Sequence, residues 1–385
     1  MVRLNFKRIV YMKVLKTFLL VLTIGLSTIA CEGDYRQEAV GAFGDAVVLM
    51  DSTEFESETA EAIRQTYGRG IQTLPNYESL FDLRFTDFRN NEELEAIKKN
   101  KNLIIASTID DSSNVGRFVR ALLDDRVEER VRNGESFAFP LEDQWYRNQW
   151  AIILTSTSDS ALADNIRSTE ESLVNSLMEK ELTRWEYEIY DRGENFALED
   201  SLWQNHGWKI RIQHDWMKNV DTSYVDNDEM NHMVTMRRPL PDNDRWFWAW
   251  WKDSVKTADF VDSDWINAKR DSLMEQWIRG SRDSSYVTTE YRRPVETDTL
   301  RVDGNLAFET LGTWRMTHDA MGGPFANMTI YDDETDRLFI IEFGQFAPRY
   351  NKRRFVRQFR AMLRTFESDS TWASKDNAAQ NMASQ

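Results

Sequence analysis

The segment "RWFWAWWKD" at residues 245–253 sets the strongest limit on how this chain can fold. In a β-strand, Trp246, Trp248 and Trp250 project to one face, while Phe247 and Trp251 project to the other. An aromatic row of this kind could stack on sugar rings. A strand that is apolar on both faces is, however, more simply a central strand buried between two layers. The segment therefore predicts a layered fold with a sheet covered on both sides.

The remaining elements agree with such a fold. The first half of the chain alternates strands and helices, and the second half is richer in strands, with helices expected at 264–278 and 352–366. These patterns predict an α+β protein with antiparallel or mixed sheets covered by helices. We expect one body over residues 39–366, organised as two lobes at 39–200 and 201–366. The polar tail, 367–385, is predicted to be disordered.

A weak internal repeat connects the two halves. "QW" at 149–150 and "SLME" at 176–179 recur as "RW" at 245–246 and "SLME" at 272–275. Both copies read as a strand followed by a helix. The identities are little above chance for apolar segments, so a duplication of the two halves stays open at this point.

The N-terminal segment has the order of a secretory signal. Lys13 and Lys16 precede an apolar run at 18–26, and small residues lead to Cys31, the single cysteine of the chain. We expect a lipoprotein signal at residues 1–30, with Met12 a more natural start than Met1, and acylation of Cys31. An ordinary signal peptide with an incidental cysteine is the alternative. Residues 31–38 would then be a short tether to the membrane.

Charge narrows the range of partners. The chain has a formal net charge of −16 at pH 7, and so acidic a surface repels the phosphate backbone of nucleic acids. We therefore expect a partner in the membrane itself, through the N-terminal lipid, and no nucleic acid. The predicted location is the cell envelope, at the outer membrane, on a periplasmic or surface face that the sequence leaves undecided.

The C-terminal part resembles a known family. The resemblance rests on Gly312, Trp314, Arg315, Met321, Gly322, Gly323, Pro324, Phe325, Ala347, Pro348, Lys352 and Arg353, and on "RWFWAW" and "RDSLMEQWIRG". These residues resemble the signature of the uncharacterised Bacteroidota lipoprotein family DUF4837, and "GDAVVLMD" and "LPNYESLFDL" resemble its opening. Thr313 departs from the leucine expected there. The resemblance implies an exported α+β lipoprotein, and it implies no activity or catalytic residues.

No stretch carries a recognisable catalytic motif. His206, His214 and His232 lie close in sequence, but they have no metal-binding spacing, and the pattern favours ordinary strand and loop histidines. We expect no catalytic residue, metal or cofactor. The "MGGPF" segment at 321–325 is read as a tight turn with positive φ at Gly322 or Gly323, rather than as a phosphate-binding loop.

The closing helix is the most unusual electrostatic feature. Its apolar stripe is flanked by basic residues, among them Arg353, Arg354, Arg357 and Arg360. One interpretation is a core-packed helix whose arginines pair with neighbouring acids. The other is a basic face that docks on anionic lipid or on an acidic protein partner. We favour the first interpretation and retain the second as the candidate site.

The sequence therefore predicts a membrane-anchored extracytoplasmic lipoprotein that binds a ligand or takes part in envelope assembly. The alternative is an envelope hydrolase that acts on glycan or peptidoglycan through paired carboxylates. A cleft with two carboxyl groups of shifted pKa would favour the hydrolase.

Overall fold

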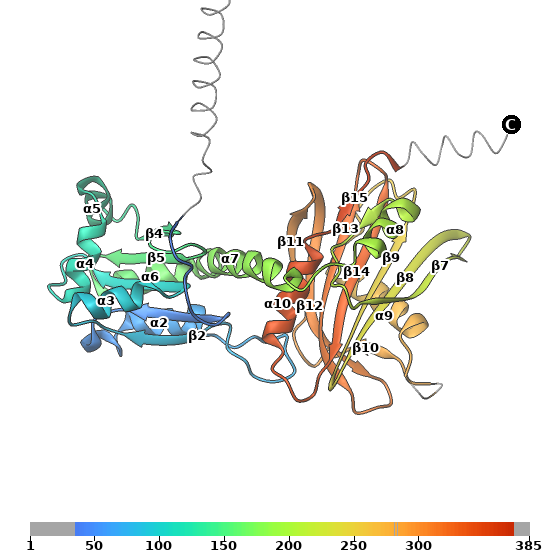
Figure 1. Cartoon of the computed structure of the whole chain (residues 1–385), viewed down its shortest axis with the longest axis horizontal. Helices are drawn as coiled ribbons and strands as arrows, with labels where there is room; N and C mark the ends of the chain where they lie inside the picture. The colour runs from blue at the N-terminus through green and yellow to red at the C-terminus, as the bar shows by residue number, and fades with distance from the viewer. Residues whose placement is uncertain (1–34, 281, 283, 373–385) are drawn as a thin grey trace, which may run out of the picture.

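The computed structural model describes residues 35–280, 282 and 284–372. Two lobes lie side by side, and the long helix α7 (Glu170–Tyr190) runs from the first lobe to the second (Figure 1). The predicted signal, Cys31 and most of the predicted C-terminal tail lie outside the described residues. Within residues 35–280, 282 and 284–372, no helix combines the length and the apolar character that a bilayer crossing requires.

The N-terminal lobe is an open α/β sheet in the order β2-β1-β3-β5-β4. Strands β2, β1, β3 and β5 are parallel, and the edge strand β4 is antiparallel to β5. The strands are β1 (Asp45–Leu49), β2 (Asp82–Thr86), β3 (Asn102–Thr108), β4 (Ala138–Glu142) and β5 (Trp150–Ser156). The helices besides α7 are η1 (Ser52–Glu54), α2 (Glu58–Tyr67), α3 (Asn91–Lys98), α4 (Asn114–Leu122), α5 (Asp125–Arg132) and α6 (Asp159–Ser168).

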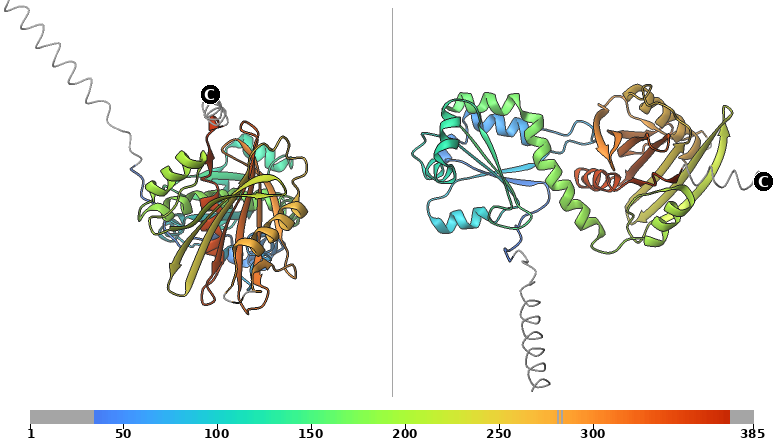
Figure 2. Two further views of the ribbon diagram at one scale, coloured as in Figure 1. Left: turned by 90° about the vertical axis from the view of Figure 1, so that its right-hand side faces the viewer. Right: turned by 90° about the horizontal axis from the view of Figure 1, so that it is seen from above.

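Helices cover both faces of this sheet (Figure 2). Helices α2 and α6 pack on one face, and α3 and α4 pack on the other. Parallel strands need crossover connections, and helices that return on both sides leave the central strands without contact to water. The apolar run of β3 follows from this arrangement, since its first six residues are buried.

The C-terminal lobe is built on a curled, antiparallel, eight-stranded sheet in the order β10-β12-β13-β14-β9-β8-β7, with β11 also paired to β12 (Figure 2). Its strands are β7 (Met217–Asp226), β8 (Glu229–Leu240), β9 (Asn243–Lys252), β10 (Val287–Thr289), β11 (Glu296–Val302), β12 (Asn305–Met316), β13 (Gly322–Asp332) and β14 (Arg337–Phe346). A short ladder joins β6 (Trp208–Lys209) to β15 (Glu367–Ser368), and the helices are α8 (Phe196–His206), α9 (Ser263–Trp277) and α10 (Arg353–Leu363). The predicted α+β class with antiparallel and mixed sheets is confirmed.

The aromatic segment is a central strand, as predicted. It forms β9, between β14 and β8. Trp246, Trp248 and Trp250 are buried on the face that α9 covers, and Phe247 and Trp251 are buried on the face that α10 covers. The row of tryptophans is therefore core, and it provides no open platform along the strand.

The turn predicted at "MGGPF" was wrong. Gly322 and Gly323 are the first residues of β13, and neither has a positive φ. Glycine is needed at residue 323 because a Cβ there would lie 2.0 Å from the carbonyl oxygen of Gln345 on β14. The constraint is a close approach between two strands rather than a left-handed backbone.

The two copies of the repeat share only the order of a strand followed by a helix. Trp150 begins β5 and Trp246 lies on β9, and each "SLME" lies on a helix, α7 or α9. The strands, however, belong to sheets of different topology, one largely parallel and one antiparallel. The structure has two lobes, and residues 200 and 201, between which the predicted division falls, both lie inside α8.

Candidate functional site

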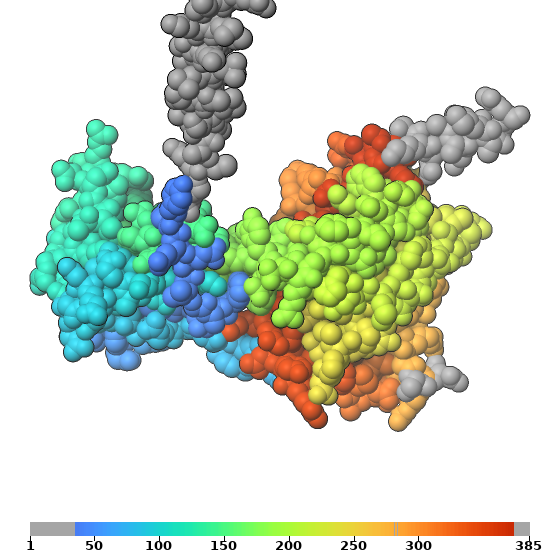
Figure 3. All heavy atoms as spheres, in the orientation of Figure 1, coloured from blue at the N-terminus to red at the C-terminus, as the bar shows by residue number. Residues whose placement is uncertain are grey.

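Arg353 and Arg357 of α10 face the other lobe. The apolar stripe of this helix is buried, with Phe355, Phe359 and Met362 at most 2% exposed. Its remaining sides contact α7 of the N-terminal lobe, and α10 lies between the two lobes (Figures 1 and 2). Figure 3 shows the red C-terminal residues directly against the blue and cyan surface of the N-terminal lobe. The predicted basic face is therefore directed into a junction.

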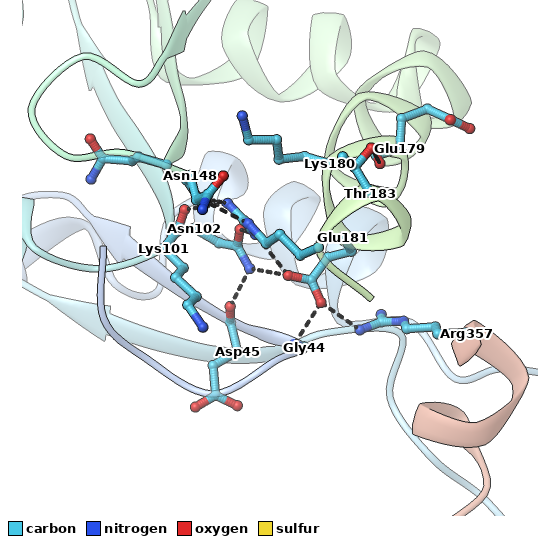
Figure 4. A network of polar contacts seen from close by, with 12 residues as sticks. Gly44, Asp45, Lys101, Asn102, Asn148, Glu179, Lys180, Glu181, Thr183 and Arg357 are labelled. Carbon is cyan, nitrogen blue, oxygen red and sulfur yellow. Dashed lines mark hydrogen bonds and ion pairs between the residues drawn. The ribbon is translucent and has the colours of Figure 1, made fainter. Parts of the chain in front are cut away.

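Glu181 of α7 is the centre of this junction (Figure 4). Its carboxylate is fully buried, and Oε2 accepts hydrogen bonds from Arg357 Nη1 at 3.2 Å and from the Gly44 amide at 2.9 Å. Oε1 accepts from Arg184 Nη1 at 2.8 Å and from Asn102 Nδ2 at 3.1 Å. Burial, offset in part by Glu181, lowers the pKa of Arg357 to about 10. The buried charge of Glu181 is tolerated because each of its carboxylate oxygens accepts two hydrogen bonds.

Glu309 holds a second arginine of α10. Arg360 donates to its two carboxylate oxygens at 3.0 and 2.6 Å. Arg364 lies 3.9 Å from the same carboxylate and donates to Glu179 of α7 at 2.6 Å. Burial would raise the pKa of Glu309, but the charge and hydrogen bonds of Arg360, with the charge of Arg364, outweigh it and lower that pKa.

The N-terminal end of α10 is capped from the other lobe. The carboxylate of Glu78 accepts hydrogen bonds from the backbone amides of Lys352 at 2.6 Å and Arg353 at 2.9 Å. The side chain of Arg353 pairs with Asp82 at 2.5 Å, and this hydrogen bond is the main reason that the pKa of Asp82 is lowered. A negative group at a helix N-terminus also complements the helix dipole.

The predicted docking face on α10 is therefore wrong. Arg353, Arg357 and Arg360 are paired with Asp82, Glu181 and Glu309. Arg354 alone of the predicted set is exposed, and its guanidinium lies 4.4 Å from the centre of the Phe355 ring. The interpretation in which arginines pair with neighbouring acids describes this helix.

Sequence reasoning missed the acidic partners. Glu181 and Glu309 are distant in sequence from α10, and no local pattern connects them to it. One signal was present, because Glu181 interrupts an apolar helical stripe that contains Leu177 and Leu182. A carboxylate on a buried helix face needs a cation opposite.

A cleft of about 630 Å³ lies at this junction. The N-terminal lobe contributes the loop at 69–74 and the side of α7 with Asn175 and Met178. The C-terminal lobe contributes β11 with Glu296 and Asp298, together with residues of α10. Arg69 on the rim pairs with Glu171 at 2.8 Å. The walls therefore combine hydrogen-bonding groups with a few apolar side chains, and Arg69, Arg353, Arg357 and Arg360 are all paired with acids.

Glu296 is the carboxyl group of the cleft with acid–base potential. Desolvation raises its pKa, the charge of Asp298 adds to the shift, and Arg69 opposes it. A raised pKa lets a carboxyl group keep its proton to a higher pH than an unperturbed one does, and such a group could donate the proton to a bound ligand.

The histidines lie away from this cleft. His206 pairs with Asp221 at 2.9 Å, and His232 contacts Ser223 and Asp253. Both imidazole rings lie 4.9 Å from the ring of Trp251. Among the described residues, no three His, Cys, Asp or Glu side chains gather in a group that could hold a metal ion.

Comparison with protein families divides the chain at the lobe boundary. Residues 194–365 match the model of a family described as a domain of unknown function, DUF4837. Residues 194–365 belong to the DUF4837 family. The match includes the aromatic strand β9, helix α9 and nearly all of the C-terminal signature quoted above.

The N-terminal lobe matches a second model. Residues 39–190 match a domain of unknown function, DUF8532, and they include the opening segments whose resemblance to DUF4837 was expected. The DUF4837 match is therefore confined to the C-terminal lobe. No curated protein matches the chain. Both matched families are described as domains of unknown function.

Proposed function

We propose that this protein is an extracytoplasmic lipoprotein, held at the cell-envelope membrane through acylated Cys31, that binds a ligand between its lobes. The signal-like order of residues 13–31 supports the anchor. The described chain is bonded to the fold from Arg36, which donates to the Asp143 carbonyl, and the carbonyl of Gln37 accepts from the Arg147 amide at 2.9 Å. Little chain therefore separates Cys31 from the folded body, which would be held close to the membrane.

The interlobe cleft is the observation that carries the binding role. Its volume of about 630 Å³ lies in the usual range for ligand sites, and such sites are frequent at domain interfaces. The arginines that border it are paired with carboxylates of both lobes. Of these pairs, Arg357–Glu181 joins the two lobes and fixes the walls relative to one another, which suits recognition of a ligand without transformation of it.

The binding role is tested by filling the cleft. Asn175 is an exposed residue of α7 in the cleft wall, and Asn175→Trp should occupy the space with little effect on the core. We expect native mass spectrometry of the full chain, purified from envelopes, to show a bound small molecule that Asn175→Trp loses. Asn205→Trp, on the exposed side of α8, is the matched control and should retain it. Identical spectra for all three proteins would contradict the role of the cleft.

The anchor is tested separately. Cys31→Ser should move the protein from the membrane fraction to the soluble fraction, because several acyl chains on one cysteine supply the attachment. A variant that stays membrane-bound after a high-salt wash would contradict anchoring through Cys31.

Glu296 favours a second candidate function, an envelope hydrolase for glycan or peptidoglycan. Its raised pKa suits a general acid, with Asp298 as the second carboxylate. If the protein were such a hydrolase, Glu296→Gln should abolish release of soluble fragments from purified peptidoglycan or envelope glycan. Absence of release by the unaltered protein would remove this candidate.

A further inference from the structure

A second hollow of about 520 Å³ lies in the DUF4837 lobe, on the face of the sheet that α9 covers. Its walls come from the β7–β8 hairpin, the segment after β9 and helix α9. It shares no residue with the interlobe cleft, so an inference about it goes beyond the proposed function. We refer to it as the Lys269 pocket.

Aromatic side chains form much of its wall. Trp250 is only 2% exposed, and its indole nitrogen donates to Asn231 Oδ1 at 3.0 Å, so its ring is fixed. Phe260 is 44% exposed and stands edge-on to Trp265, with 5.2 Å between ring centres. An exposed phenylalanine beside an ordered tryptophan leaves an aromatic surface available at the pocket mouth.

Lys269 differs from its neighbours. It follows Trp265 by one helical turn of α9, so the two side chains share a helix face. Its Nζ lies 4.3 Å from the centre of the Trp250 ring, and within the described part of the chain no carboxylate is within ion-pair distance of it. In contrast, Lys252 pairs with Glu229 at 2.6 Å and Lys256 pairs with Asp336.

Burial lowers the pKa of Lys269, and the charge of Asp226 opposes the shift. The cation is therefore partly desolvated, and its charge is left without a close counter-ion. An anion that enters the pocket would supply that counter-ion and would recover part of the lost solvation.

We propose that the Lys269 pocket binds an acidic sugar, with the sugar ring on Phe260 and Trp265 and its carboxylate on the Lys269 ammonium. The C–H face of a pyranose ring carries positive partial charge and suits the negative face of an aromatic ring. Its hydroxyl groups suit the exposed polar side chains of the pocket wall, such as Ser254 and Asn227. The acidic side chains Asp226 and Glu229 line the same pocket and disfavour a multiply charged phosphate, so a single carboxylate is the better match.

The test is titration of the full-length protein, followed by calorimetry, with three probes: galacturonate, galactose and benzoate. Galacturonate should bind at least tenfold more tightly than galactose. A hydrogen bond to a charged partner typically contributes a factor of roughly ten to a hundred in affinity, so Lys269→Met should remove this preference and leave weak galactose binding. Phe260→Ala should weaken both sugars several-fold, and its exposed position keeps the fold intact.

Lys99→Met is the matched control, since it removes the same charge from an exposed position of the other lobe. It should bind galacturonate as the unaltered protein does. Absence of galacturonate binding, or equal binding by Lys269→Met, would overturn the proposal. Preference for benzoate over galacturonate would overturn the assignment to sugars. The interlobe variant Asn175→Trp should leave galacturonate binding unchanged, which keeps this test separate from that of the proposed function.

Discussion

The cations of α10 and the cation of Lys269 present two different arrangements in one chain. Arg357 and Arg360 are withdrawn from water at the lobe junction, and each is bonded to a carboxylate. Lys269 of α9 is half-buried beside an aromatic ring on the opposite face of the same C-terminal sheet, and no carboxylate of the described chain is paired with it. Both arrangements place a positive charge in a poorly solvated position.

The difference lies in what balances the charge. A buried arginine with its partner in place holds elements together, and loss of either partner leaves an uncompensated charge. Withdrawing a charged lysine from water without a partner costs free energy, and a ligand that supplies the counter-ion can recover part of it. Such groups concentrate at functional sites. The most basic segment of the sequence is therefore structural, and an isolated lysine is the better candidate for binding.

The largest effect is expected from Glu181→Ala. This change leaves Arg184 and Arg357 buried without their shared carboxylate and should lower the free energy of unfolding by about 3–5 kcal/mol, measured by urea denaturation. Glu179→Ala is the control, because Glu179 is exposed and its pair with Arg364 should contribute only ~0–1 kcal/mol. A loss below about 1 kcal/mol for Glu181→Ala would mean that the junction does not depend on this charge.

A smaller loss is expected from Arg357→Met. Glu181 would keep its bonds from Arg184, Asn102 and the Gly44 amide, so the carboxylate stays compensated. We expect a loss of about 1–3 kcal/mol in the same denaturation experiment, chiefly from the lost hydrogen bonds. A loss equal to that of Glu181→Ala would show that Arg357 is the essential partner of Glu181. It would contradict the smaller effect expected here.

The effects expected from Glu181→Ala and Arg357→Met depend on contacts between the lobes that the sequence did not identify. The elements themselves were largely readable, because β3 and β9 are apolar on both faces and α10 has a continuous apolar stripe. The pairing of α10 with Glu181 could not be read, since it depends on how the two lobes meet, and its pairing with Glu309 depends on where α10 lies against the sheet of its own lobe. Arginines on one helix face look identical in sequence whether solvent or a carboxylate lies opposite.

Other local features were also misread or missed because the sequence does not show contacts between distant parts of the chain. Gly323 was correctly recognised as a constrained position, but the constraint is the Gln345 carbonyl on the neighbouring strand rather than a turn. Strand β11 with Glu296 was not recognised, because its first four residues alternate charged and small polar side chains and only Leu300 and Val302 are apolar. Lys269 was unremarkable in sequence, and only its position over Trp250 distinguishes it from other helix lysines.

Acid should weaken the junction by a moderate amount. The pKa values of Asp82 and Glu309 are lowered in the folded protein, by the Arg353 hydrogen bond for Asp82 and by Arg360 against burial for Glu309. Carboxyl groups of this kind stabilise the fold above their unfolded pKa, near pH 4, and the contribution is lost as the pH falls through the folded value. As the pH is lowered, we expect the free energy of unfolding of Glu309→Gln to fall by ~1 kcal/mol less than that of the unaltered protein. An unchanged pH profile of the variant would contradict the pairing of Glu309.

The smallest effect is expected from Arg354→Glu, at the exposed arginine of the predicted docking face. Its ring contacts should contribute ~0–1 kcal/mol to stability. Because the other arginines of the set are paired, sedimentation of the unlipidated body with phosphatidylglycerol vesicles should be equally low for the parent and the variant. Salt-sensitive binding by the parent that Arg354→Glu abolishes would restore the docking interpretation.

The central claim, that Lys269 is a poorly solvated cation open to a ligand, is tested most directly by amine labelling of the folded full chain with trinitrobenzenesulfonate, an anionic aromatic reagent, followed by peptide mass spectrometry. Lys269 has a lowered pKa beside an aromatic surface, whereas Lys352 is 2% exposed and donates to the Ala347 carbonyl at 2.6 Å. The account predicts that Lys269 reacts faster than exposed Lys99, that Lys352 stays unlabelled, and that galacturonate slows the reaction at Lys269 alone. Labelling of Lys269 as slowly as Lys352, or labelling that galacturonate leaves unchanged, would contradict it.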